Sequence, residues 1–298
     1  MILGKKAKQE AEKKLRIDSR MPIPLQDTTE RLPTFTAYLL SRRITFITIP
    51  ELIKVIRRTC LEGKKMIVAS YNINSFNLSM HLPWFYDFLQ SAEIARCDGF
   101  GILKAFQYMG LSLSQKYRAS GTVLVPSLLE QLKSEDFSFF LLGSKPQYIE
   151  KALTRIREQY PTLRVEGHHG YFDKEDYYQN EAVVQYINRV KPNILIVGMG
   201  MPTQERWIQR HRHLLDVNVI LPSGAVIDRL AGIVPDCPKV ISDIGCEWLY
   251  RLCREPRRLA ARYLIGNFAF GLQVALAKHS HTSSLHVEQK EIIGSQSF

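Results

Sequence analysis

No stretch of this sequence reaches the roughly 18 consecutive apolar residues that a membrane-spanning helix needs. Its five cysteines include no CxxC pair and no metal-ligand spacing, which predicts reduced thiols in a cytosolic protein. No two aspartates stand two positions apart, so the Asp-x-Asp pair that would suit a divalent metal is missing. The first residues are rich in Lys and Glu rather than apolar, and we therefore expect no signal peptide.

Acidic residues are also few relative to basic ones. The 298 residues include 40 Lys and Arg against 29 Asp and Glu, which gives a formal net charge of +11 at pH 7. This surplus predicts an acidic partner, which could be nucleic acid, anionic lipid or a phosphorylated substrate. A hydrophobic content of 45% is ordinary for a folded globular protein.

Apolar runs alternate with amphipathic stretches through most of the chain, with short links between them. This pattern predicts an α/β fold with a Rossmann-like core, in which helices connect the strands of a parallel sheet. The predicted strands are 44–47, 66–70, 93–97, 137–142, 163–166, 194–197 and 217–221. The predicted parts of the chain are a basic arm and connector (1–42), the α/β core (43–238), a helical, Arg-rich, membrane-associating appendage (239–278) and a polar tail (279–298).

The predicted strand at 194–197 leads into a turn with Gly198 and Gly200, followed by Pro202 and Thr203. Glycines allow a sharp turn, and proline suits the first turn of a helix. Free backbone N–H groups at a helix N-terminus bind anions, so a phosphate-like group is predicted near residues 198–203. Thr203 stands where a dinucleotide fingerprint needs its third glycine. A plain turn between a strand and a helix is the alternative.

Residues that follow the predicted strands are candidates for a site, because open α/β sheets bind ligands at the carboxyl ends of their strands. Asp98 is the only carboxylate directly at such an end between two small or flexible neighbours. It is either a functional carboxylate or the cap of the helix that begins near Gly101. The other polar or small residues at strand ends are Ser70, Asn72, Gly143, Ser144, Lys145, Ser223 and Gly224.

Basic and aromatic residues alternate in the C-terminal third of the chain. Arginine binds diphosphates through its planar fork and also suits an anionic membrane surface. Residues 264–277 are nearly free of charge, which fits a helix that lies in a membrane interface or, alternatively, a buried core helix. The arginines at near-helical spacing are Arg251, Arg254, Arg257, Arg258 and Arg262.

Four motifs in a fixed order resemble those of a known family, the WecG/TagA/CpsF group or glycosyltransferase family 26. The likeness covers residues 43–270 and implies a Rossmann-like core with a C-terminal appendage that completes the active site at the membrane. The motifs are Asp98-Gly99-x-Gly101, Gly198-x-Gly200-x-Pro202-x-Gln204-Glu205, Asp228-x-x-Ala231-Gly232 and Glu247-Trp248-Leu249-x-Arg251-Leu252-x-x-Glu255-Pro256-x-Arg258-Leu259.

The resemblance implies inverting transfer of a hexose-type sugar, such as glucose or N-acetylmannosamine, from a UDP-sugar to a polyprenyl-diphosphate-linked saccharide. Such enzymes build bacterial exopolysaccharides and other cell-surface polysaccharides. The resemblance also implies a peripheral protein on the anionic cytoplasmic face of the inner membrane, without a nucleic-acid partner. It leaves open whether the chain forms a homo-oligomer.

The same resemblance assigns roles to individual residues. The general base falls on Asp98, the family's Thr-x-Asn motif falls on Ser70 and Asn72, and Gln204 matches a glutamine of the catalytic set. Serine therefore replaces the usual threonine at Ser70, and Val123 stands where many members have an aspartate. The expected substrate-binding residues are Gly99, Gly101, Gly198, Gly200, Thr203, Glu205, Asp228, Arg251, Arg254, Arg258 and Arg262.

Inverting transfer needs a base for the acceptor hydroxyl, and Asp98 can serve if a dry site raises its pKa. Without an Asp-x-Asp pair, backbone amides or arginines would meet the charge on the departing UDP, so we expect catalysis without a metal or cofactor. Two other hypotheses stay open. One is a nucleotide-dependent enzyme such as a dehydrogenase, which the glycine pattern disfavours. The other is a non-catalytic basic α/β protein that binds a membrane, a nucleotide or nucleic acid.

Overall fold

The computed structural model describes residues 33–235, 237–238, 240–241, 245–279 and 285–288. Its strands are β1 (Phe35–Leu39), β2 (Arg42–Phe46), β3 (Met66–Tyr71), β4 (Ile94–Cys97), β5 (Ser138–Gly143), β6 (Arg164–His168), β7 (Ile194–Gly198), β8 (Val219–Pro222) and β9 (Leu285–Glu288). Its helices are α2 (Ile49–Leu61), α3 (Ile73–His81), α4 (Pro83–Ser91), α5 (Phe100–Tyr108), η1 (Gln115–Tyr117), α6 (Gly121–Leu132), α7 (Pro146–Gln159), α8 (Tyr177–Val190), α9 (Thr203–His211), α10 (Val226–Leu230), α12 (Glu247–Arg254), α13 (Pro256–Ala260), η2 (Ala261–Ile265) and α14 (Gly266–His279).

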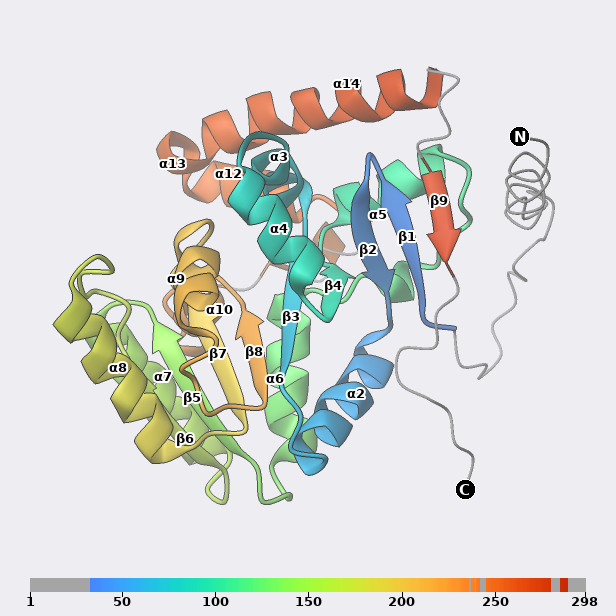
Figure 1. The fold of residues 1–298 in the computed structure, drawn as a ribbon. Helices are drawn as coiled ribbons and strands as arrows, with labels where there is room; N and C mark the ends of the chain where they lie inside the picture. Colours follow the sequence, from blue (N-terminus) through green and yellow to red (C-terminus); the bar gives the residue numbers. More distant parts are fainter. Residues whose placement is uncertain (1–32, 236, 239, 242–244, 280–284, 289–298) are drawn as a thin grey trace. The chain divides into compact units, whose positions relative to one another are not determined.

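The described strands form one nine-stranded sheet in the order β6-β5-β7-β8-β3-β4-β2-β1-β9 (Figure 1). Neighbours from β6 to β2 pair in parallel, whereas β1 and β9 extend the sheet antiparallel beyond β2. Parallel pairing requires a crossover between strands, and the intervening helices provide it. The predicted α/β class with a mostly parallel sheet is therefore confirmed.

Helices cover both faces of this sheet. In β7, Leu195 and Val197 pack into one apolar cluster, whereas Ile194 and Ile196 pack into the other. Burial on both faces explains why the central strands are continuous apolar runs rather than alternating patterns. Helices α3, α4, α5, α8, α9 and α14 contribute to the first cluster, and α2, α6, α7 and α10 contribute to the second.

The sheet opens between β3 and β8. These strands pair only through Met66 with Val219 and Ile67 with Ile220, near their amino ends. On its other side, β3 stays paired with β4 as far as Tyr71 and Cys97. The carboxyl ends of β3 and β8 therefore diverge, which creates the kind of crevice where open α/β sheets bind ligands.

Two strands lie where the sequence predicted none. β1 falls inside the predicted connector, and it forms a hairpin with β2 through Leu40 and Ser41, which both have positive φ. β9 falls inside the predicted polar tail and pairs with β1, from which it is separated by most of the sequence. The predicted helix near 80–90 corresponds to α4, and a separate helix, α3, precedes it. The two helices are distinct because Pro83 begins α4 directly after the C-cap residue of α3.

The C-terminal helices pack on the core with one side of α14. Phe270 and Val274 are buried in the first apolar cluster, and the Phe270 ring lies 5.0 Å from that of Phe76 in α3. Phe268, Leu272 and Leu276 on the same helix are at least half exposed. The helix thus makes the core contact of one predicted alternative and also exposes an apolar surface, whereas a position in a membrane interface stays a prediction. Within the described residues, no helix is both long and apolar enough to cross a membrane.

Candidate active site

A cavity of about 1010 Å³ lies where β3 and β8 diverge, and most of the predicted site residues line it. Helix α12 and the segment after it form part of its boundary, so distant parts of the chain meet there. Three predicted residues are not placed at the cavity: Glu205 is buried elsewhere, Arg254 is exposed, and the side chain of Arg258 lies outside the described part. The predicted residues that line the cavity are Ser70, Asn72, Asp98, Gly99, Gly101, Gly198, Gly200, Thr203, Gln204, Asp228, Arg251 and Arg262.

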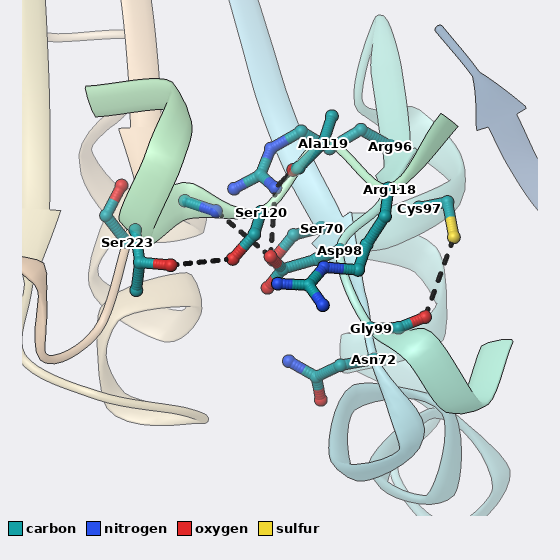
Figure 2. A network of polar contacts seen from close by, with 12 residues as sticks. Ser70, Asn72, Arg96, Cys97, Asp98, Gly99, Arg118, Ala119, Ser120 and Ser223 are labelled. Atoms are coloured by element: carbon teal, nitrogen blue, oxygen red, sulfur yellow. Dashed lines mark hydrogen bonds and ion pairs between the residues drawn. The ribbon is translucent and has the colours of Figure 1, made fainter. Parts of the chain in front are cut away.

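Asp98 follows β4 directly and points toward the N-terminus of α6 (Figure 2). Its Oδ1 accepts a hydrogen bond from the Gly121 backbone N–H at 3.0 Å and lies 3.2 Å from Nη1 of Arg96. The alternative that Asp98 caps α5 is wrong, because Gly99 is the cap residue and no side chain caps that helix. Asp98 instead places its charge at the positive end of another helix, α6.

The pKa of Asp98 lies below its ordinary value. Burial alone would raise this pKa, but the Arg96 charge and hydrogen bonds from Gly121, Arg96 and Ser120 together lower it. The condition drawn from the sequence, a site dry enough to raise this pKa, is therefore not met, because the positive charge and the hydrogen bonds outweigh burial. The consequence is a carboxylate that is ionised at neutral pH and so able to accept a proton.

Ser70 and Asn72 sit beside Asp98 at the end of β3. The side chain of Asn72 accepts a hydrogen bond from the Ser75 N–H at 3.1 Å and so caps α3. Ser70 is buried and is the register partner of Arg96 in β4. Both side chains line the cavity, so the residues of the Thr-x-Asn-like motif and Asp98 are brought together as expected.

Glycines gather after the ends of β5, β6, β7 and β8, and three of them, Gly170, Gly198 and Gly224, line the opposite side of the cavity. A Cβ on Gly143 would lie 2.4 Å from the Gly198 carbonyl oxygen, and a Cβ on Gly198 would lie 2.7 Å from that of Gly224. A Cβ on Gly170 would lie 2.9 Å from Gly143 Cα. These four glycines, here called the glycine wall, allow backbone segments to approach more closely than any side chain permits.

Gln204 is completely buried and joins the turn after β7 to the turn after β8. Its Oε1 accepts hydrogen bonds from the N–H groups of Gly200 at 3.1 Å and Gly224 at 3.0 Å. Its Nε2 donates to Oε1 of Glu205 at 2.8 Å, and burial raises the pKa of Glu205 to about 7. The Gly200 N–H is therefore not available to a phosphate, contrary to the simplest form of the predicted anion site. Gln204 thus positions the backbone of both turns, and the hydrogen bond to Glu205 fixes the orientation of the Gln204 amide.

Glu247, at the start of α12, contacts three arginines. Its carboxylate lies 3.0 Å from Arg251, 3.3 Å from Arg229 and 3.6 Å from Arg118. Arg118, Glu247, Arg251 and Arg262 all line the cavity. Arginine side chains at a cavity provide planar donor groups that suit a diphosphate.

Several lining residues were not singled out from the sequence, and Arg96 and Arg118 are the most important. Arg96 is a charged residue inside the predicted strand 93–97, and Arg118 follows a short 3₁₀ turn without a recognisable motif. Ser144 and Lys145 were noted only as strand-end residues. In the structure, Ser144 Oγ donates a hydrogen bond to Asp228, and Lys145 lies 5.6 Å from the Tyr148 ring.

The described residues contain no group of three or more His, Cys, Asp or Glu side chains that could hold a metal ion. This agrees with the missing Asp-x-Asp pair, but the metal requirement of the reaction stays a prediction. Positive charge at the cavity comes instead from arginine and lysine side chains.

The geometry defines a site at the carboxyl ends of the strands of an α/β sheet, with the carboxylate of Asp98 and several arginines among its lining residues. The chain belongs to the glycosyl transferase WecG/TagA/CpsF family, whose model matches residues 37–284. It is similar to the N-acetylglucosaminyldiphosphoundecaprenol N-acetyl-β-D-mannosaminyltransferases of Staphylococcus aureus strains MW2 and NCTC 8325 / PS 47. Each is 29% identical over 213 residues, which cover 72% of this chain and 82% of the relative.

Proposed function

We propose that this chain is an inverting glycosyltransferase that moves a hexose-type sugar from a UDP-sugar to a polyprenyl-diphosphate-linked saccharide. The observation that carries the proposal is the carboxylate of Asp98, whose pKa is lowered by Arg96 and by hydrogen bonds, in a large cavity that Arg118, Arg251 and Arg262 also line. The names of the relatives favour N-acetylmannosamine as the sugar and N-acetylglucosaminyl diphosphoundecaprenol as the acceptor. The product would serve a cell-surface polysaccharide, of which an exopolysaccharide is one kind.

In this mechanism the acceptor hydroxyl attacks the anomeric carbon on the side opposite to the leaving UDP. Asp98 takes the hydroxyl proton as the new carbon–oxygen bond forms. The bond between the anomeric carbon and the β-phosphate oxygen breaks, and UDP leaves with the electron pair. Arg118, Arg251 and Arg262 would balance the charge that grows on the diphosphate, so we expect transfer without a metal.

The exposed apolar side of α14 suits the surface of a membrane that carries the acceptor. Phe268, Leu272 and Leu276 lie outside the core contact, and Leu264 and Ile265 are exposed just before them. Apolar side chains beside arginines fit an interfacial helix on anionic lipid. We propose that the protein binds peripherally to the cytoplasmic face of the inner membrane through this side.

The test is a panel of UDP-sugars with a short-chain lipid diphosphate carrying N-acetylglucosamine, assayed for formation of a disaccharide. UDP-N-acetylmannosamine is expected to give the highest kcat/KM, and the product should have the inverted anomeric configuration. Asp98→Asn serves as the matched inactive control. Tight binding of UDP without transfer from any donor would overturn the proposal and support a nucleotide-binding protein without catalysis.

A further inference from the structure

Arg96 is an unusual residue to find inside a central parallel strand. It is only 1% exposed, and it lies between Thr45 of β2 and Ser70 of β3 in the register of the sheet. Burial of a guanidinium costs free energy unless the charge is paired and hydrogen-bonded. The contacts of Arg96 therefore indicate what this charge is for.

The hydrogen-bond and ion-pair contacts of Arg96 lie toward Asp98 and the turn before α6. Its Nη1 donates to the Ala119 carbonyl oxygen and lies 3.2 Å from Oδ1 of Asp98 (Figure 2). Its Nε has no hydrogen-bond partner among the described residues. The head group thus connects β4 to the turn that supplies the Gly121 N–H to Asp98.

The turn from Ala119 to Gly121 is shaped around this guanidinium. The Ala119 N–H donates to the Cys97 carbonyl at 2.9 Å, which fixes the turn beside the end of β4. A Cβ at Gly121 would lie 3.2 Å from Nη2 of Arg96, so glycine leaves just enough space. Arg96 and Gly121 both contact the same oxygen of Asp98, Oδ1.

We propose that Arg96 is the positioning residue of the base: it holds Oδ1 of Asp98 toward the core, so that Oδ2 receives the proton of the acceptor. This inference rests on the proposed function, because it assumes that Asp98 acts as the base. Arg96 does not need to touch either substrate for this role. It acts through the orientation and the charge of Asp98.

The other groups near Asp98 do not replace Arg96. Ser120 and the Gly121 N–H donate hydrogen bonds but carry no full charge. Arg118 lies nearby in Figure 2, but its guanidinium also contacts the Glu247 carboxylate, 3.6 Å away. The Cys97 thiol is directed to the Gly99 carbonyl oxygen, and burial raises the pKa of this thiol to about 12, so it stays neutral. A donor diphosphate would bring negative charge, which makes the Arg96 charge more important for keeping Asp98 ionised.

The test compares Arg96→Met with Arg96→Lys in the pH dependence of kcat/KM for transfer. Arg96→Met should move the acid limb to higher pH, so that the ratio of kcat/KM at pH 8 to that at pH 5.5 rises about tenfold or more. Arg96→Lys keeps the charge and should leave the acid limb in place, but kcat should fall about tenfold because lysine lacks the planar fork. An unmoved acid limb in Arg96→Met, or an unchanged kcat in Arg96→Lys, would overturn the proposal.

Two further measurements separate this inference from a structural role and from the proposed function. Thermal unfolding and UDP binding show whether each variant is folded, and if Arg96→Met does not fold, the kcat of Arg96→Lys decides. A carboxyl ¹³C titration of Asp98, assigned with Asp98→Asn, follows the same protonation without any substrate. If wild-type protein transfers no sugar, the proposed function fails, whereas the titration still reports whether Arg96 controls Asp98.

Discussion

The two sides of the cavity differ in composition: one consists of backbone and the other presents polar side chains. The glycine wall is made of backbone, with Gly143 and Gly198 so close that any side chain would collide. The opposite side, here called the carboxylate wall, presents the side chains of Ser70, Asn72 and Asp98 at the ends of β3 and β4. Backbone segments in close contact define a shape but offer little chemistry. Side chains with a buried counter-charge can hold a proton acceptor in place.

Under the proposed function, we expect the donor to bind at the glycine wall and the proton to be transferred at the carboxylate wall. The divergence of β3 from β8 is what separates the two walls, because the strands stop pairing after Ile67 and Ile220. A ligand between the walls would contact rigid backbone on one side and an ionised carboxylate on the other. Substitutions on each wall should therefore have different consequences, and the following predictions test this.

Asp98→Asn should have the largest effect on activity. Loss of a general base typically lowers turnover by about 10²–10⁴-fold, and UDP binding should change little because Asp98 belongs to the carboxylate wall. Steady-state kinetics and calorimetry with UDP measure the two quantities. Asp228→Asn is the matched control at the other wall, and it should raise the KM for the donor more than it lowers kcat. Near-normal turnover in Asp98→Asn would contradict the expectation that proton transfer takes place at the carboxylate wall.

Gly143→Ala should affect stability rather than chemistry. Its added Cβ would meet the Gly198 carbonyl at 2.4 Å, and the backbone φ of +154° is unfavourable for alanine. Overpacking of this kind costs about 1–3 kcal/mol in the free energy of unfolding, which urea denaturation can measure. Gly271→Ala is the matched control, because nothing lies within 4 Å of its Cβ and it sits in α14. That variant should gain roughly 0.5–1 kcal/mol, and equal effects of the two substitutions would contradict close packing at the wall.

The fold was largely predictable from the sequence, because buried parallel strands are continuous apolar runs that stand out between polar stretches. Asp98 was also predictable, since it follows such a run directly. The strands β1 and β9 were missed because their pairing joins residues such as Thr36 and Glu288, which are far apart in the chain. A local pattern cannot reveal a partner at that distance.

The roles of the site residues were harder to predict than their positions. Gln204 was expected in the catalytic set, but its contact with Gly224 depends on how two strand ends meet in the sheet. The role of Arg96 could not be predicted from the sequence, because the role of a charged residue in a strand depends on its neighbours in the folded structure. The position of most lining residues was therefore predictable from the sequence, whereas the role of each residue depends on its tertiary contacts.

The two sides of α14 offer a parallel comparison, between a buried face and an exposed one. Phe268 is 74% exposed, whereas Phe270 is buried against Phe76. Phe268→Glu should weaken binding to anionic vesicles about tenfold, since burial of such a side chain contributes about 1.5–3 kcal/mol. Transfer to a short soluble acceptor should stay close to normal. Flotation with vesicles measures the first effect, and Tyr177→Glu is the control, because Tyr177 is an exposed aromatic residue on α8.

Removal of metal should have the smallest effect, and none is expected. Under the proposed function, Arg118, Arg251 and Arg262, which line the cavity, would supply the positive charge that the departing diphosphate needs. Transfer measured in excess EDTA should therefore equal transfer in the presence of Mg²⁺ or Mn²⁺. Arg251→Met provides the contrast, because it removes part of this charge and should lower kcat with or without metal. If EDTA abolished transfer and Mg²⁺ restored it, a bound metal would be needed in addition to the arginines to balance the charge on the departing UDP. The residues of the two walls would then be insufficient for catalysis.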